Sequence, residues 1–94
     1  MADYERVTVL PAKEVFRLAE EILPERVNLE RTRETRHNAT YTGGEGTVTI
    51  DAHRHGMKTT VTVITNQLRT SKLDGAVRYL MNQYPYQHND PGRE

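Results

Sequence analysis

Apolar and polar residues alternate along a run of thirty residues, from Arg36 to Thr65. A period of two is the pattern of strands with one buried face. Glycine-containing turns divide the run into three expected strands, His37–Thr42, Thr47–Arg54 and Met57–Thr65. Strands joined by such short turns pair antiparallel.

Two further strands are predicted before this run. Tyr4–Leu10 alternates and presents Val7 and Val9 to one face. Val27–Arg33 alternates too, and the charge density of its outer half is typical of a protected sheet edge. The link from this strand to the next, through Glu34 and Thr35, is irregular enough to predict a bulge there.

Two segments have helical periodicity. Pro11 suits the first turn of one helix, and Pro24 is expected to end it. The apolar positions between these prolines are Val15, Phe16, Leu18, Ala19, Ile22 and Leu23. Ser71 begins a near match to a capping box with Asp74, and Gly75 suggests a close helix–sheet approach. The second apolar face comprises Leu73, Ala76, Val77, Leu80, Met81 and Tyr84, before Pro85.

These elements follow the order β-α-β-β-β-β-α. A helical crossover makes the first two strands parallel in direction, and three hairpin reversals leave the fifth antiparallel to the first. We therefore predict an α+β fold, a two-layer sandwich with an antiparallel five-stranded sheet of order 1-5-4-3-2 and both helices on one face. This topology resembles one repeat of the TATA-binding-protein fold and a short helix-grip domain, and the resemblance implies a fold but no function. We expect one domain over 1–86 and a flexible polar tail over 87–94.

Turn chemistry predicts the register of the two hairpins. If Gly44 and Glu45 form a type II′ turn, partner numbers sum to 89; if His55 and Gly56 form the next turn, they sum to 111. One face, the core face, then carries the rows Tyr41–Val48–Val63, Ala39–Ile50–Val61 and His37–Ala52–Thr59. The other, the threonine face, carries Thr42–Thr47–Ile64, Thr40–Thr49–Thr62, Asn38–Asp51–Thr60 and Arg36–His53–Lys58.

The last of these rows is a candidate anion site. Arg36, His53 and Lys58 would lie side by side, where like charges repel unless they share a phosphate or carboxylate. The alternative is a solvated sheet end with its side chains splayed apart. Asp51, His53 and His55 also alternate, but a turn at His55 and an opposing Lys58 disfavour a cation, so no metal site and no cofactor are predicted.

The threonine face is the second candidate, through Thr40, Thr49, Thr62 and Ile64, with Tyr4 or Leu10 adding apolar surface. It is either a plain solvated face or a docking surface for a second copy of the chain, a peptide or a nucleic acid. Small domains often gain stability by association, which favours a homodimer or another protein as the partner.

Composition narrows these choices. The chain has 94 residues, 13 basic and 13 acidic side chains, and no cysteine, so thiol chemistry is excluded and no overall field favours nucleic acid. Neither a membrane-length apolar run nor a signal peptide is apparent, and a cytoplasmic location is the expectation. A nucleic-acid surface would use Arg31, Arg33, Arg36, Arg54 and Lys58, but the threonine face lacks aromatic residues for base stacking.

No catalytic motif is present, so no catalytic residue is assigned and an enzyme is not favoured. We expect a small non-enzymatic binding or interaction module that self-associates. One alternative is a small-ligand or hydrolytic pocket between the C-terminal helix and the sheet, with Tyr41, His37 and Tyr79 as its polar groups. Another is nucleic-acid or anion binding through the open sheet face.

Overall fold

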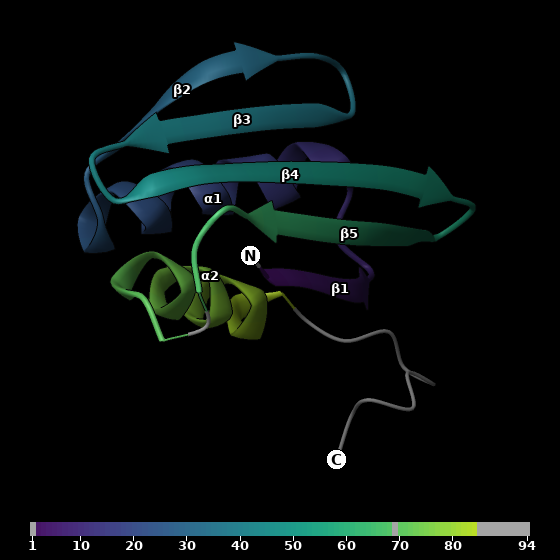
Figure 1. Ribbon diagram of the computed structural model, residues 1–94. Coiled ribbons are helices and arrows are strands. Elements are labelled where there is room, and N and C mark those ends of the chain that lie inside the picture. Colours follow the sequence, from purple (N-terminus) through teal and green to yellow (C-terminus); the bar gives the residue numbers. More distant parts are fainter. Residues whose placement is uncertain (1, 69, 85–94) are drawn as a thin grey trace.

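The chain forms five strands and two helices in the predicted order (Figure 1). The structure, a computed structural model, describes residues 2–68 and 70–84, so Pro85 and the expected tail lie outside the described residues. The elements are β1 (Ala2–Thr8), α1 (Ala12–Arg26), β2 (Leu29–Glu34), β3 (Asn38–Gly43), β4 (Gly46–His55), β5 (Lys58–Thr65) and α2 (Lys72–Gln83).

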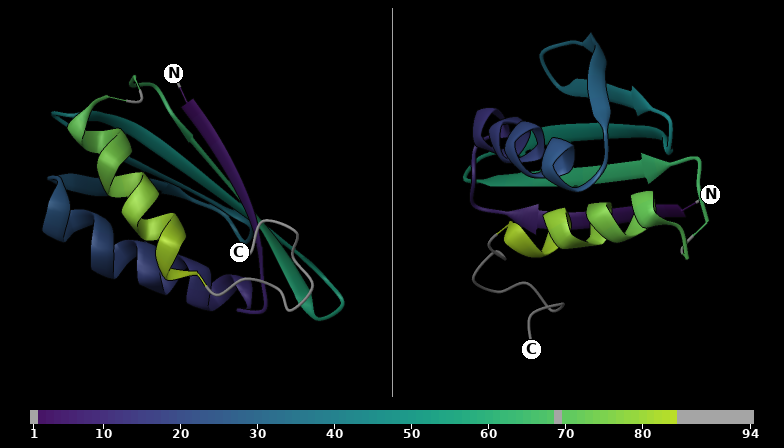
Figure 2. Two further views of the ribbon diagram at one scale, coloured as in Figure 1. Left: turned by 90° about the horizontal axis from the view of Figure 1, so that it is seen from below. Right: turned by 90° about the vertical axis from the view of Figure 1, so that its left-hand side faces the viewer.

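The strands make one antiparallel sheet in the predicted order β1-β5-β4-β3-β2. Both helices lie on the same side of this sheet, as the left-hand view of Figure 2 shows. The charged strand β2 occupies one edge, as predicted, where charge discourages pairing with another chain. The molecule is thus a two-layer α+β structure, and we call the uncovered side of the sheet the open face.

The core fills the space between the sheet and the helices. Its strand residues come from alternate positions of β3, β4 and β5, and its helix residues from the inner faces of α1 and α2. Each large aliphatic side chain buried there contributes roughly 1.5–3 kcal/mol to folding. The members of the predicted core face are buried, with the exception of His37. The side chains that are 0% exposed include Val15, Ala19, Leu23, Val48, Ile50, Ala52, Val61, Val63, Leu73, Val77 and Leu80.

The β3–β4 hairpin has the predicted register, in which Asn38 pairs with Asp51 and Gly43 with Gly46. The turn type was predicted wrongly, because the positive φ of 136° belongs to Gly46 and not to Gly44. A Cβ atom on Gly46 would also lie 2.7 Å from the Asn66 side chain. Glycine is therefore required at position 46, because of the positive φ and because a Cβ atom would be too close to Asn66.

The β4–β5 hairpin differs from the prediction by two residues. His55 pairs with Lys58, so Gly56 and Met57 form the turn, and partner numbers sum to 113. Gly56 has φ 64°, a left-handed conformation that glycine adopts with less strain than histidine. Because the shift is an even number of residues, every side chain keeps its predicted face but changes its neighbours.

The end of α1 and the position of a β-bulge both differ from the predictions made from the sequence. α1 continues past Pro24 to Arg26, because proline has a helical φ and in the last turn removes only one backbone donor. The Val27 amide then closes the helix on the Leu23 carbonyl at 2.9 Å. The expected bulge lies within β2, between Arg31 and Arg33, rather than at the β2–β3 link.

A buried carboxylate joins α2 to the edge strand β1. The Ser71 hydroxyl accepts a hydrogen bond from the Asp74 amide, as the predicted cap requires. The Asp74 side chain is 0% exposed and accepts the Tyr4 hydroxyl at 2.7 and 2.8 Å and the Arg78 Nε at 3.0 Å. Charge-assisted hydrogen bonds of this kind compensate a carboxylate for lost hydration.

Further contacts hold the two helices in place. Arg6 of β1 donates to the carbonyl of Tyr84 at 3.3 Å, and the Tyr84 hydroxyl donates to the Val15 carbonyl of α1 at 2.9 Å. The Arg26 guanidinium lies 3.6 Å from the centre of the Tyr79 ring, a cation–π contact between α1 and α2. The helical layer is therefore fixed by polar contacts at its margins as well as by its apolar core.

Two glycines should respond oppositely to alanine. A Cβ atom on Gly75 of α2 meets nothing within 4 Å, so the expected close approach does not exist. We expect Gly75→Ala to raise the free energy of unfolding by about 0.5–1 kcal/mol and Gly46→Ala to lower it by about 1–3 kcal/mol. Urea denaturation measures both, with Gly44→Ala as a control in open space. Equal effects at positions 46 and 75 would contradict this assignment.

Tyr4→Phe should destabilise the protein by about 1–3 kcal/mol, because it removes a donor from a buried carboxylate. Asp74→Asn should cost a comparable amount, and the double variant should cost less than the two single variants together. Chemical denaturation of the three variants gives this coupling energy. Tyr79→Phe serves as the matched control, since Tyr79 is 41% exposed. Additive effects of the Tyr4 and Asp74 variants would show that the contact does not anchor α2.

Candidate functional site

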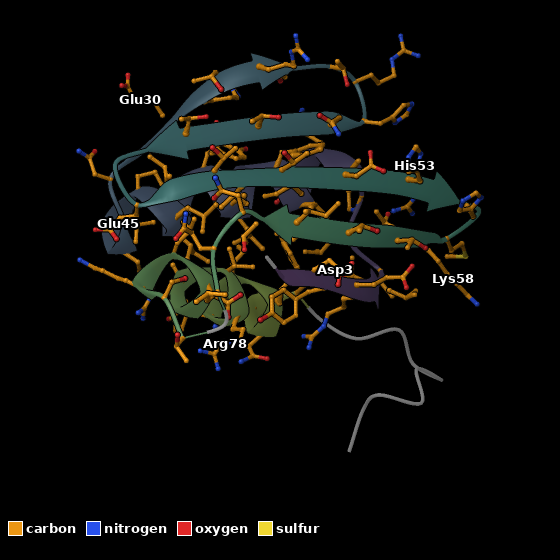
Figure 3. All side chains as sticks on the ribbon, viewed as in Figure 1. Asp3, Glu30, Glu45, His53, Lys58 and Arg78 are labelled. Carbon is orange, nitrogen blue, oxygen red and sulfur yellow. The ribbon has the colours of Figure 1, made fainter. Side chains whose placement is uncertain are left out.

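The open face is built from alternate residues of all five strands (Figure 3). Hydroxyl-bearing side chains occupy much of its middle, where Asp51 on the central strand β4 is the acidic residue, and the other charged residues lie nearer the edges. Its successive rows are Arg33–Thr40–Thr49–Ile64–Asp3, Asn38–Asp51–Thr62–Glu5 and His53–Thr60–Val7.

The structure places the predicted interaction residues on this one face. Thr40 and Thr49 are direct partners, with hydroxyl oxygens 3.4 Å apart. Ile64 follows Thr49 in the same row and is 44% exposed, and Thr62 lies in the next row. The corrected hairpin register makes Ile64 the neighbour of Thr49 instead of Thr47.

The apolar contribution of β1 was predicted wrongly. Tyr4 and Leu10 pack against the core on the helix side of the sheet. Val7 instead pairs with Thr60 and is half-buried on the open face, and Val9 just beyond is 45% exposed. The sequence analysis placed these two valines together on one face but did not assign them to the open face, because alternation alone does not say which side of a strand faces the core.

The central row of the open face has opposite charges at its two ends. Arg33 lies on β2 at one edge of the sheet, and Asp3 lies on β1 at the other edge. The central strand of the five is β4, and Thr49 on this strand is the middle residue of the row. The row is therefore antisymmetric in charge about the central strand.

The predicted anion row does not form. His53 pairs with Thr60, and Lys58 pairs with His55 at the end of the hairpin. Arg36 lies in the connection between β2 and β3, outside both strands. The incorrect β4–β5 register brought Lys58 beside His53, and Arg36 was paired with His53 by extending β3 beyond its first residue, Asn38. No shared anion site follows from this row.

His37 was also misplaced by the sequence. It lies at the bend before β3, is exposed, and stacks on His53 with ring centres 5.3 Å apart and planes 28° from parallel. The His53 Nε2 atom lies 2.9 Å from an Asp51 carboxylate oxygen. Over residues 2–68 and 70–84, no group of three or more histidine, cysteine or acidic side chains is placed to hold a metal ion.

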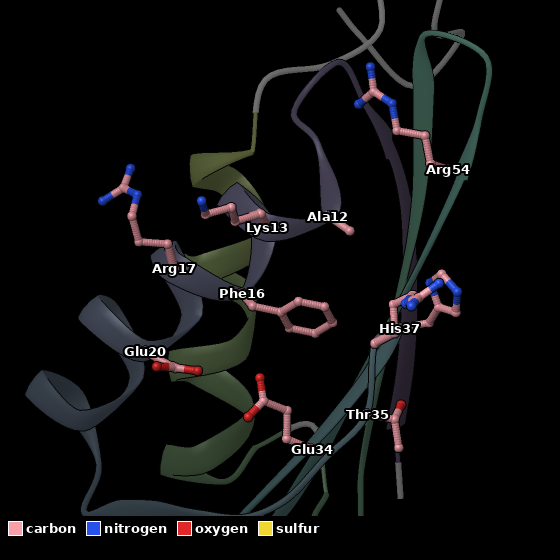
Figure 4. A pocket seen from close by; sticks show the side chains of 10 residues that line it. Ala12, Lys13, Phe16, Arg17, Glu20, Glu34, Thr35, His37 and Arg54 are labelled. Carbon is pink, nitrogen blue, oxygen red and sulfur yellow. The ribbon is translucent and has the colours of Figure 1, made fainter.

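The three polar groups expected to line a pocket beside the C-terminal helix have different surroundings. Tyr41 is buried and its hydroxyl lies 3.4 Å from the Glu20 carboxylate, whereas Tyr79 contacts Arg26. These two tyrosines and His37 do not line a common cavity. A cavity of about 490 Å³ does exist, but it lies beside α1 and the β2–β3 connection (Figure 4).

The basic residues considered for nucleic acid do not share one surface. Arg31 binds Glu20 and lies 3.6 Å from Glu34 on the helix side. Arg54 donates to the Thr59 hydroxyl at 3.2 Å and lines the cavity beside α1. Arg33 belongs to the open face. A continuous basic track for a phosphate backbone is therefore absent from the described part of the chain.

Comparisons with protein-family models, curated proteins and solved structures found no match. In the part of the chain that the structure describes, no helix has the length and apolar character needed to cross a membrane. Function must therefore be argued from the geometry of the open face and of the cavity.

The buried phenol of Tyr41 should make the folded protein less stable at alkaline pH. Burial raises the pKa of its phenol above the ordinary value of about 10, and the Glu20 carboxylate adds to this shift. The folded state thus holds the proton more tightly, so this contribution is fully present below about pH 10 and is lost as pH rises further. The free energy of unfolding should fall above pH 10, and less steeply for Tyr41→Phe. Denaturation at several pH values tests this, with Tyr79→Phe expected to fall like the wild type.

Proposed function

We propose that the protein is an interaction module that pairs with a second copy of itself through the open face. The charge-antisymmetric row from Arg33 to Asp3 supports this proposal most directly. Apolar surface on the same face also supports the proposal, because Ile64 is 44% exposed there and Val7 is half-buried.

The row is complementary to itself under a two-fold rotation. A two-fold axis along β4, between two facing sheets, exchanges the β1 and β2 edges of the copies. Arg33 of each copy then faces Asp3 of the other, and the Thr49 residues meet at the axis. Ile64 faces Thr40, whose methyl group gives it an apolar partner. Sheets that pack face to face cross at about 30°, a deviation that the long arginine side chain accommodates.

The size of the open face implies weak association. Five strands of 6 to 10 residues, about 4.8 Å apart, cover roughly 500–600 Å² in projection. Stable complexes bury about 800 Å² on each partner, so a face of this size suits a transient dimer. The chain should therefore be largely monomeric at low micromolar concentration and should dimerise at several hundred micromolar.

A charge exchange tests both the face and its symmetry. Arg33→Glu or Asp3→Lys alone should weaken dimerisation about tenfold, because each places like charges opposite each other twice. The double variant should restore it, since the exchanged charges are again complementary. Sedimentation equilibrium over a range of concentrations measures the three dissociation constants.

Arg17→Glu on the helix side is the matched control, because it changes charge equally and lies away from the open face. It should leave the dimerisation constant unchanged. Ile64→Lys should abolish dimerisation whatever the orientation of the copies. A monomer at all concentrations, or single variants indistinguishable from wild type, would refute the proposal.

A further inference from the structure

The cavity beside α1 lies on the side of the sheet opposite the open face. It is lined by the first turns of α1, by the connection from β2 to β3 and by the end of β4. The cations in the lining are Lys13, Arg17, Arg36 and Arg54, the carboxylates are Glu20 and Glu34, and the large apolar group is Phe16. These six charged groups come from four separate segments, α1, β2, the β2–β3 connection and β4, so only the folded chain assembles them.

The carboxylates of this cavity are already bound. Glu20 forms an ion pair with Arg31, and Glu34 lies 3.6 Å from the same guanidinium. Glu20 also accepts the Tyr41 hydroxyl. Arg31 itself is not part of the cavity lining, so both carboxylates are neutralised by a group outside the cavity.

Among the described residues, three of the four cations of the cavity lack acidic partners, and the fourth, Arg17, pairs with Glu14 and Glu21. Within residues 2–68 and 70–84, Lys13 and Arg36 form no ion pair. Arg54 donates to the Val9 and Gly56 carbonyls and to a threonine hydroxyl, which are neutral acceptors. Lys13, Arg36 and Arg54 therefore line the cavity without a paired carboxylate, which favours a positive local field although the net charge of the chain is zero.

The N-terminus of α1 adds to this field. Ala12 and Lys13 are the first two residues of the helix and both line the cavity. Pro11, at the N-cap, makes no side-chain hydrogen bond to the first turn. The positive end of the helix dipole thus lies at the part of the cavity that carries Lys13, where an anion is favoured.

The cavity also has an apolar centre. Figure 4 shows the Phe16 ring projecting from α1 toward the sheet, with Lys13 and Arg54 nearer one end of the opening and Glu34 nearer the other. Its volume of about 490 Å³ is within the range of small-molecule sites. A ligand lying over Phe16 would therefore have Lys13 and Arg54 toward one end and Glu34 toward the other.

We propose that this cavity binds a small organic anion, an apolar or aromatic body with a single carboxylate or phosphate group. The acidic group lies among Lys13, Arg36 and Arg54, and the body packs on Phe16. Arginine provides two parallel donors for a carboxylate or phosphate, and lysine a compact charge. The site is independent of the open face, so the failure of either proposal leaves the other intact.

Titration with phenyl phosphate tests the site, followed by ¹⁵N–¹H NMR of the full chain. We expect saturable binding, with the largest shifts at residues 12–17, 34–37 and 54. Inorganic phosphate should bind about tenfold more weakly, because it cannot use Phe16, and benzyl alcohol should not bind detectably, because it lacks the charge. Benzoate in place of phenyl phosphate distinguishes a carboxylate site from a phosphate site.

A pair of double variants with equal charge change separates the cavity from general basicity. Lys13→Gln with Arg36→Gln should weaken phenyl phosphate binding at least tenfold, and both residues are exposed, so folding should persist. Arg33→Gln with Lys58→Gln removes two charges from outside the cavity and should leave the affinity unchanged. Equal effects of the two double variants would overturn the proposal, as would inorganic phosphate binding as tightly as phenyl phosphate.

Discussion

The buried carboxylate of Asp74 is the constraint on which the arrangement of the helical layer depends. It ends the first turn of α2 and accepts its hydrogen bonds from Tyr4, at the other end of the chain, and from Arg78. An unpaired carboxylate in that position would cost several kcal/mol, so α2 cannot slide along β1 without losing these donors. The contact thus fixes where α2 lies, and with it which parts of the sheet remain uncovered.

This constraint also determines the character of the open face. Because Tyr4, Arg6 and Thr8 face the helices, the alternating pattern sends Asp3, Glu5 and Val7 to the other side. The helix-facing positions of β1 are thus polar or amphipathic, and its one valine in this stretch, Val7, lies on the open face. The open face therefore gains an acidic edge and an additional valine.

Much of the fold could be predicted because alternation and helical periodicity report burial directly. The strand order followed from one crossover and three hairpins, and the β3–β4 register from its turn. The β4–β5 register could not be obtained in the same way, because a shift of two residues preserves the alternation. Only the conformation of Gly56 distinguishes the two registers, and a histidine–glycine pair allows the left-handed residue to be assigned to either member.

The candidate sites were harder to predict for a related reason. Neighbours across a sheet depend on register, so the wrong β4–β5 turn placed Lys58 beside His53. Arg36 and His37 were misplaced for another reason, because β3 begins only at Asn38. Arg36 lies in a connection, where periodicity gives no direction, and its neighbours Lys13 and Arg54 belong to distant segments. Nothing in the local sequence of either residue indicates this proximity.

The positively charged residues of the cavity could not be predicted from the overall charge of the chain either. The chain carries equal numbers of acidic and basic side chains, which argues against a strong overall field. Arg31, however, engages two carboxylates at once, while Lys13 and Arg36 engage none among the described residues. A neutral chain can therefore contain a locally positive cavity, because pairing in the fold is unequal even when composition is equal. The cavity and the open face lie on opposite sides of one sheet, so a ligand at α1 and a second copy at the open face would not compete for space.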